Sequence, residues 1–164
     1  MLQSLAQFVR RLPSCDSKVT VERQVGAIPY AVVQDRAAFL LITSRRTGRW
    51  IFPKGAVTDG FTERELAARE AFEEAGVVGT VEPDVAGAYR DWKTRNLMRY
   101  PIEVALYPLR VEQQLETWRE AGQRYRHWAI FPEARKLLTN PGLVEMIARI
   151  DRRVRAGGPQ SPVA

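Results

Sequence analysis

The chain has 164 residues, 45% of them hydrophobic, which predicts one domain with a single sizeable core. No apolar run approaches the roughly 18 to 20 residues of a membrane span, and the single cysteine, Cys15, cannot form an internal disulfide, so we expect a cytoplasmic protein without membrane contact. The net charge of +6 predicts an anionic partner, and the scattered arginines and lysines favour a small-molecule polyphosphate over nucleic acid.

Residues 1–18 form an N-terminal extension with two interpretations. Its first part, MLQSLAQFVRRLPSC, places apolar residues at helical spacing beside two arginines and no acid. This pattern predicts a helix docked on the domain, and it is also typical of a mitochondrial transit peptide. We expect the docked helix.

The segments that follow alternate between strand and helix patterns. VGAIPYAVV, AFLLITS and RWIF are rich in β-branched and aromatic residues and predict three strands, with Pro29 indicating an edge or a bulge. A helix is predicted over 62–75, followed by strands at AGAYRDW, LMRYPIEVALYPL and RYRHWAI, with the polar KTRN as a hairpin loop.

The C-terminal part is predicted to be helical. Helices are expected over 132–139 and 141–154, because Pro132 and the pair Asn140 and Pro141 are helix start signals. We expect one domain over 19–154 and a disordered tail over 155–164. Mixed strands and helices predict an α/β fold, a mixed sheet covered by helices.

The helix over 62–75 has well-defined ends. Thr62 and Glu65 form a capping box, Phe61 and Leu66 occupy the positions of a hydrophobic staple, and Gly76 supplies a left-handed stop.

Four glutamates gather on one side of this helix. At about 100° per residue, Glu63, Glu70, Glu73 and Glu74 fall within a narrow arc, and we expect an apolar side of Ala68, Ala71, Phe72 and Ala75 to pack inward. Like charges at i,i+4 are destabilising, so the acidic side is either a solvated face or a site for a cation. Oxygen-only ligands favour Mg²⁺ or Mn²⁺.

GAVTDGFTERELAAREAFEEAGV, residues 55–77, resembles the Nudix box. The matching positions are Gly55, Arg69, Glu70, Glu73, Glu74, Gly76 and Val77. Phe61 stands where the box has a further glutamate, which puts the detailed mechanism in question.

The resemblance implies a Nudix-type α/β/α sandwich and hydrolysis of acid anhydrides in phosphorus compounds. It implies that Glu70 and Glu74 bind divalent metal directly and that Glu73 binds a further metal or its water. It also implies that Arg69 pairs with a neighbouring carboxylate, and that a backbone carbonyl at Lys54 or Gly55 completes the site. Glu73 and Arg69 are therefore the catalytic candidates.

The segments on either side of residues 55–77 indicate which branches of the family the chain resembles. TSRRTGRWIFPKG and ETWREAGQRYRHWAIFPEARKLL are similar to the diphosphoinositol polyphosphate phosphohydrolase branch, whereas PKG also resembles asymmetric dinucleoside tetraphosphate hydrolases. Both relatives act on crowded phosphate chains. Arginine binds phosphate through paired hydrogen bonds, so the substrate-binding candidates are Arg23, Arg45, Arg46, Lys54, Arg124 and Arg126.

Other roles stay open at this level. The general base could be Glu73, Glu103, Glu112, Glu116 or Glu120. We expect His127 to be a packed strand residue, Trp50 and Trp92 to lie in the core, and Trp118 to sit in a loop over the site or in a surface turn.

Three functions are compatible with the sequence. The first is a pyrophosphohydrolase of diphosphoinositol or dinucleoside polyphosphates, as a monomer or homodimer. The second keeps the chemistry but acts on nucleoside triphosphates, nucleotide sugars, ADP-ribose or capped RNA. The third, suggested by Phe61, is a noncatalytic phosphate-binding module.

Overall fold

The structure is a computed structural model that describes residues 21–157. The extension predicted over 1–18 lies outside the described residues, as does the tail from residue 158 onward. Within the described range, the last helix ends at Arg155, so this residue belongs to the helix and not to the predicted tail.

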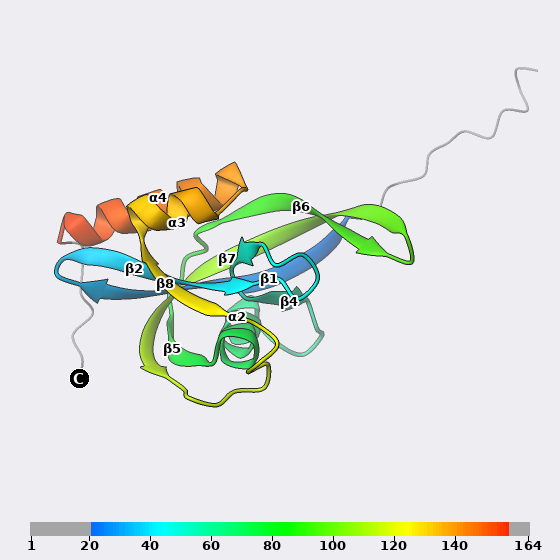
Figure 1. Ribbon diagram of the computed structural model, residues 1–164, viewed down its shortest axis with the longest axis horizontal. Coiled ribbons are helices and arrows are strands. Elements are labelled where there is room, and N and C mark those ends of the chain that lie inside the picture. The colour runs from blue at the N-terminus through cyan, green and yellow to red at the C-terminus, as the bar shows by residue number, and fades with distance from the viewer. Residues whose placement is uncertain (1–20, 158–164) are drawn as a thin grey trace, which may run out of the picture.

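One mixed sheet of eight strands forms the middle of the molecule (Figure 1). Its main path runs β3-β2-β1-β7-β5, while β4 pairs with β1, β6 with β7 and β8 with β2. Among the pairs of named strands within residues 21–157, only that of β1 with β7 is parallel. The strands are β1 (Glu22–Val33), β2 (Arg36–Thr43), β3 (Trp50–Ile51), β4 (Lys54–Ala56), β5 (Val77–Val81), β6 (Gly87–Arg95), β7 (Met98–Gln114) and β8 (Arg126–Ile130).

Helices cover both faces of this sheet. The long helix α4 (Pro141–Arg155) and the short α3 (Phe131–Leu137) lie on one face, and α2 (Glu63–Glu70) with the π-helical turn η1 (Ala71–Ala75) lies on the other (Figure 1). The predicted α/β/α sandwich is therefore confirmed. Within residues 21–157, no helix is both long and apolar enough for a membrane span.

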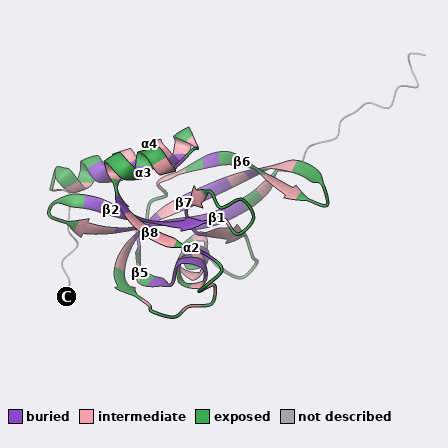
Figure 2. Ribbon diagram, in the orientation of Figure 1, coloured by how far each residue is buried: buried purple, intermediate pink, exposed green. Residues whose placement is uncertain are grey.

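Two hydrophobic cores, in place of the single one expected, follow from the alternation of side chains along the strands. Figure 2 marks the buried residues of these strands in purple. In β2, Phe39 and Leu41 pack toward α3 and α4, whereas Leu40 and Ile42 pack toward α2. Because a strand directs successive side chains to opposite faces, a strand covered on both faces is apolar throughout. This arrangement explains the continuous apolar runs in the sequence.

Pro29 lies in a central strand whose register to β7 is unbroken, so neither the edge nor the bulge that the sequence indicated is found there. β1 pairs with β4 over 24–26 and with β2 from Tyr30 onward, so the proline falls where the antiparallel partner changes. A residue without an N–H is tolerated there because it interrupts neither antiparallel ladder.

Two short strands, β4 and β5, escaped the sequence analysis, and the hairpin loop is shorter than predicted. Residues 93–95 of KTRN continue β6, and the turn is made by Asn96 and Leu97 at φ 48° and 64°. Two residues with positive φ suit a tight hairpin, because their twist matches that of the strands.

Candidate active site

The acidic helix begins and ends as its sequence predicts. Thr62 accepts a hydrogen bond from the backbone of Glu65, and the Glu65 side chain accepts from the backbone of Thr62, which completes the capping box. At the other end, Gly76 adopts φ 63° and ψ 42°, the left-handed stop. The turn before it, Ala71–Ala75, is π-helical.

The acidic side of this helix is partly buried against the protein, so the fully solvated face, one of the two interpretations that the sequence left open, is wrong. Leu66 falls within the glutamate arc and Ala67 next to it, and both are buried, so burying them turns the glutamates inward. On the side expected to pack inward, Ala71 and Ala75 are fully buried as predicted, whereas Phe72 is 48% exposed. The side chains of Glu70 and Glu74 are only 13% and 11% exposed.

Phe61 does not staple to Leu66. It is 52% exposed, and the guanidinium of Arg69 lies 5.1 Å from the centroid of its ring. Arg69 also donates to the Thr58 hydroxyl at 3.3 Å and lies 3.9 Å from the Glu70 carboxylate. Phe61 thus helps to hold the arginine beside the carboxylates.

A cleft of about 370 Å³ brings most of the predicted site together. Its floor is β4, where Lys54 and Gly55 lie against the helix. The sequence-predicted residues that line it are Arg45, Arg46, Lys54, Gly55, Glu70, Glu73, Glu74 and Glu120.

Glu70 and Glu74 are held by β4 at close range. The backbone N–H of Lys54 donates to Glu74 at 3.0 Å, and a side chain at Gly55 would overlap the Glu70 carboxylate. Burial, followed by repulsion from Glu74 and Glu73, raises the pKa of Glu70 to about 7. Burial also raises the pKa of Glu74, and Arg124 opposes that rise.

Three predicted substrate-binding arginines do not line this cleft. Arg124 is buried, pairs with both Glu74 and Glu120, and donates to the Thr43 carbonyl at 2.9 Å. Its donors hold the carboxylates in place, so Arg124 is a positioning residue.

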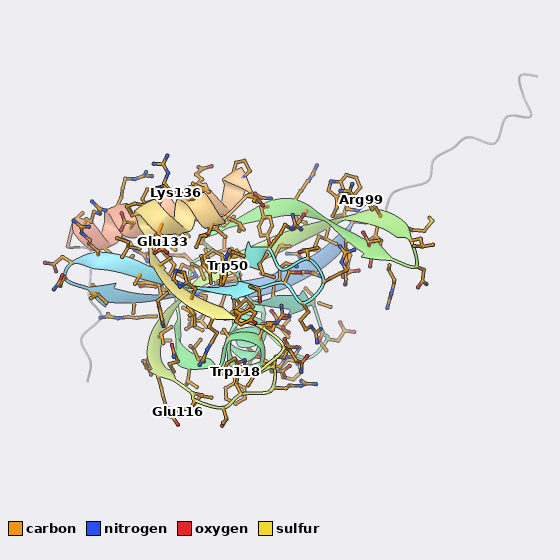
Figure 3. The ribbon with its side chains drawn as sticks, in the orientation of Figure 1. Trp50, Arg99, Glu116, Trp118, Glu133 and Lys136 are labelled. Atoms are coloured by element: carbon orange, nitrogen blue, oxygen red, sulfur yellow. The ribbon has the colours of Figure 1, made fainter. Side chains whose placement is uncertain are left out.

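Arg126 closes the end of the acidic helix and does not reach the cleft. It donates to the carbonyls of Ala75 and Leu115 at 3.0 Å each and lies 3.7 Å from the ring centroid of Trp118. Trp118 in turn donates to the Glu74 carbonyl at 3.2 Å, on the α2 side of the sheet (Figure 3). Arg23 is also outside the cleft and pairs with Glu63 at 2.9 Å.

Two cations of the cleft were missed from the sequence, Arg49 and Lys93. Lys93 was assigned to a loop, although it continues β6 two residues after Asp91, a spacing that places both on one face. Lys93 pairs with Glu22 at 2.8 Å and Arg49 with Asp91 at 4.0 Å. Lys54 donates to Gln24 at 2.8 Å, and burial lowers its pKa.

Among the candidates for the general base, Glu73 and Glu120 line the cleft. Glu73 pairs at 2.6 Å with Arg119, whose side chain is 70% exposed. Glu103 and Glu116 do not line it, and Glu112 accepts instead from the Thr80 hydroxyl at 2.6 Å.

The aromatic side chains divide between core and cleft. Trp50 packs against the core on the α4 side, but Trp92 is 52% exposed and lines the cleft, contrary to expectation. His127 lies in β8 as expected and contacts Glu133 at 2.7 Å and Trp50 at 5.7 Å between ring centroids, but its side chain is 41% exposed and so only partly packed.

The donor chemistry fits a hard divalent cation. Glu70, Glu73 and Glu74 offer carboxylate oxygens, and glycine at position 55 leaves room at the Glu70 carboxylate. Within residues 21–157, however, no three acidic, histidine or cysteine side chains converge on one point. Glu73 pairs closely with Arg119 and Glu74 with Arg124, whereas the arginine paired with Glu70, Arg69, lies 3.9 Å away.

Known proteins share both sequence and fold with this chain. The model of the NUDIX domain matches residues 22–150. In Arabidopsis thaliana, Nudix hydrolase 17, mitochondrial, is 34% identical over 119 residues, covering 68% of this chain and 64% of that protein. Nudix hydrolase 21, chloroplastic, is 33% identical over 134 residues, covering 79% and 66%. The aligned part therefore spans less than two thirds of these relatives' length.

Solved structures agree on the fold. A binary complex of a C. elegans Ap4A hydrolase has a TM-score of 0.62 and 21% identity, covering 84% of this chain and 99% of that one. The NUDIX domain of Shewanella oneidensis NrtR, complexed with ADP ribose, has a TM-score of 0.61 and 14% identity, covering 88% and 97%. At such identities, the likeness shows the fold alone.

Proposed function

This chain belongs to the Nudix family, and we propose that it is a pyrophosphohydrolase that cleaves a phosphoanhydride bond within a chain of phosphates. Nudix hydrolases generally use divalent metal ions. For this chain we propose Mg²⁺ or Mn²⁺, held by Glu70 and Glu74, with Glu73 and a carbonyl at Lys54 or Gly55 as further ligands.

The observation that carries this proposal is the pairing of opposite charges across one cleft. Inward-facing carboxylates on the helix meet a set of cations on the strands and on the loop after β2, namely Arg45, Arg46, Arg49, Lys54 and Lys93. A cleft lined by carboxylates alone would repel a phosphate chain. A phosphate chain held by the cations alone would leave the glutamates without a role. A polyphosphate that arrives with a divalent cation satisfies both sets.

The reaction is a displacement at phosphorus. Water attacks one phosphorus atom, the bond to the bridging oxygen breaks, and the leaving phosphate takes the electron pair of that bond. A bound divalent cation supplies Lewis-acid polarisation of phosphoryl oxygens and lowers the pKa of water.

The chain's own residues supply positioning and proton transfer. Arg45 and Arg46 hold the phosphates that do not react, and Lys54 adds a positive charge at the floor of the cleft. Glu73 accepts the proton of the attacking water, because it lines the cleft and its partner Arg119 is exposed and free to move away. Arg69 orients Glu70.

We propose diphosphoinositol polyphosphates or dinucleoside polyphosphates as the substrates, because five cations suit a long phosphate chain. The likeness to an Ap4A hydrolase supports the second group. Other nucleoside diphosphate compounds are the alternative. A noncatalytic module loses support, because Phe61 still holds Arg69 beside the intact carboxylates.

The test is phosphate release with Mg²⁺ across inositol pyrophosphates, dinucleoside penta- and hexaphosphates, nucleoside triphosphates and ADP-ribose. Glu74→Gln should abolish turnover, and the matched control is Glu145→Gln, whose side chain is 72% exposed on α4. Circular dichroism establishes that both variants fold. Turnover that survives in Glu74→Gln would overturn the site, and no turnover of any substrate would overturn the proposed activity.

A further inference from the structure

The hairpin between β6 and β7 carries exposed apolar side chains at its end. It projects from the molecule at the end opposite the hairpin between β1 and β2 (Figure 1). Leu97 is 100% exposed, Met98 72% and Trp92 52%. We call residues 92–101 the hairpin tip. Its apolar side chains are left largely uncovered, so the fold gains little from their burial.

The turn itself is an unfavourable place for a leucine. Asn96 and Leu97 adopt φ 48° and 64°, and glycine is preferred at the second position of such a turn because a side chain is strained there. The turn between β1 and β2 has similar φ values, 50° and 59°, but places the polar residues Gln34 and Asp35 there. Leu97 gains no burial that would offset its strain, so the stability of the fold does not explain it.

The hairpin tip is basic as well as apolar. Its sequence, WKTRNLMRYP, contains Lys93, Arg95 and Arg99 and no acidic residue. Lys93 pairs with Glu22, whereas the ion pairs formed among residues 21–157 include neither Arg95 nor Arg99. The Arg99 guanidinium lies 5.2 Å from the centroid of the Trp92 ring, which keeps this charge beside the apolar side chains. The tip therefore offers apolar surface and two arginines to an anionic partner.

We propose that the hairpin tip docks on an anionic lipid surface. Leu97 and Met98 enter the interfacial layer, while Arg95 and Arg99 contact the acidic head groups. The tryptophan beside them suits the same boundary, because its ring is mostly apolar and its N–H is polar. The apolar turn favours lipid over nucleic acid, which is bound mainly through its phosphates. A convex turn also offers little area for a stable protein–protein interface, which buries about 800 Å² on each partner.

Docking of this kind needs no membrane-spanning segment. It revises the absence of membrane contact that the sequence predicts, and it does not depend on the proposed activity. The part of β6 nearest the tip carries Asp91, Trp92 and Lys93, which line the cleft. Docking therefore holds the cleft next to the lipid surface.

Co-sedimentation of the full chain with lipid vesicles measures the docking. The two vesicle types are phosphatidylcholine alone and phosphatidylcholine mixed with phosphatidylserine, both at physiological salt concentration. We expect at least about tenfold tighter binding to the vesicles with phosphatidylserine, because each free arginine near an anionic surface contributes about fivefold.

Variants of the turn then locate the contact. Leu97→Gly gives the turn the residue that its backbone prefers, so it should unfold at the same or a higher temperature while binding the phosphatidylserine vesicles about tenfold more weakly. Arg95→Gln should weaken this binding about fivefold. The matched control, Val33→Thr, changes a 56% exposed apolar side chain beside the turn between β1 and β2, and it should bind like the parent chain.

Each outcome decides for or against the lipid contact. Equal binding to the two vesicle types overturns it, and so does binding that Leu97→Gly leaves unchanged, which is the result that simple adsorption of a basic chain gives. The same variants are tested for binding to duplex RNA and for self-association in sedimentation velocity. If vesicles are not bound and Leu97→Gly abolishes either of these interactions, the hairpin tip contacts nucleic acid or a second copy, and the proposal is overturned.

Discussion

The two helical layers obey different rules of burial. On α4, the buried positions are Leu143, Met146, Ile147 and Ile150, spaced three and four apart, with Asn140 as the N-cap. Its buried acid, Asp151, pairs at 2.8 Å with Arg155 one turn later. On α2 and η1, buried Leu66, Ala67 and Ala71 share the inward side with Glu70 and Glu74.

This difference indicates that the buried residues of α4 serve stability, whereas those of α2 and η1 also serve the chemistry of the cleft. Apart from the Asp151–Arg155 pair, the α4 layer follows from the burial of apolar surface. In the α2 layer, two carboxylates are desolvated next to each other, which opposes folding and raises their pKa values. The cost is partly offset by Arg124 and the Lys54 N–H, both from other parts of the chain. Such an arrangement is expected where a site must bind a cation.

Among the predicted changes, removing a carboxylate from α2 should have the largest effect, a loss of activity. We expect Glu70→Gln to lower kcat/KM for the best polyphosphate substrate by about a thousandfold, or ~4 kcal/mol, because it removes an anionic ligand while keeping the shape of the side chain. Steady-state kinetics at several Mg²⁺ concentrations measure the loss. Glu145→Gln on α4 should retain full activity, and equal losses in the two variants would erase the distinction between the layers.

Breaking the buried ion pair should have the next largest effect. Arg124→Met leaves Glu74 and Glu120 without their buried partner, so the free energy of unfolding should fall by about 3–5 kcal/mol in urea titrations. Adding Glu74→Gln should recover part of the loss. On α4, Glu145→Gln removes the exposed partner of Arg149 and should cost under about 1 kcal/mol. Equal losses of unfolding free energy in the two variants would contradict the contrast between the α2 and α4 layers.

Stability without metal should decrease with pH because of the same carboxylates. The pKa of Glu70 is raised from its ordinary 4.5 to about 7, so between these values the folded protein holds a proton that the unfolded chain has lost. The free energy of unfolding should therefore fall as the pH rises from about 4.5 to about 7, by roughly 2–3 kcal/mol.

Thermal unfolding in EDTA across this pH range measures the slope. Glu70→Gln should reduce the slope and raise the melting temperature at pH 8, although the variant has lost most of its activity; the remaining slope belongs to Glu74, whose pKa is also raised. Glu22 and Glu65 have lowered pKa values, so they act below about 4.5, outside this window. A slope that is unchanged in Glu70→Gln would show that Glu70 is not the group responsible.

The sequence was enough to predict the fold and the acidic helix, because capping residues, apolar runs and the box are local signals. Thr62, Glu65 and Gly76 act as predicted. It was not enough to predict which arginines reach the cleft. Arg124 and Arg126 bind partners contributed by the acidic helix and the loop before β8, and such long-range contacts leave no local pattern.

The inward position of the glutamates was also missed, for a specific physical reason. Ala71 and Ala75 are buried as predicted, but the expected apolar side left out Leu66 and Ala67, which lie within and next to the glutamate arc. A large buried leucine contributes more to helix orientation than several alanines, because burial energy scales with apolar area.

The smallest expected change in the free energy of unfolding tests directly which way the acidic helix faces. Phe72→Ala should change the free energy of unfolding by less than about 0.5 kcal/mol, because the side chain is half exposed and joins neither core. Ile147→Ala on α4, fully buried, should cost about 2–4 kcal/mol. If Phe72→Ala cost as much as Ile147→Ala, the helix would have to be rotated so that Phe72 faces inward. The glutamates would then return to solvent, where neither the raised pKa of Glu70 nor the burial of Arg124 beside them could be explained.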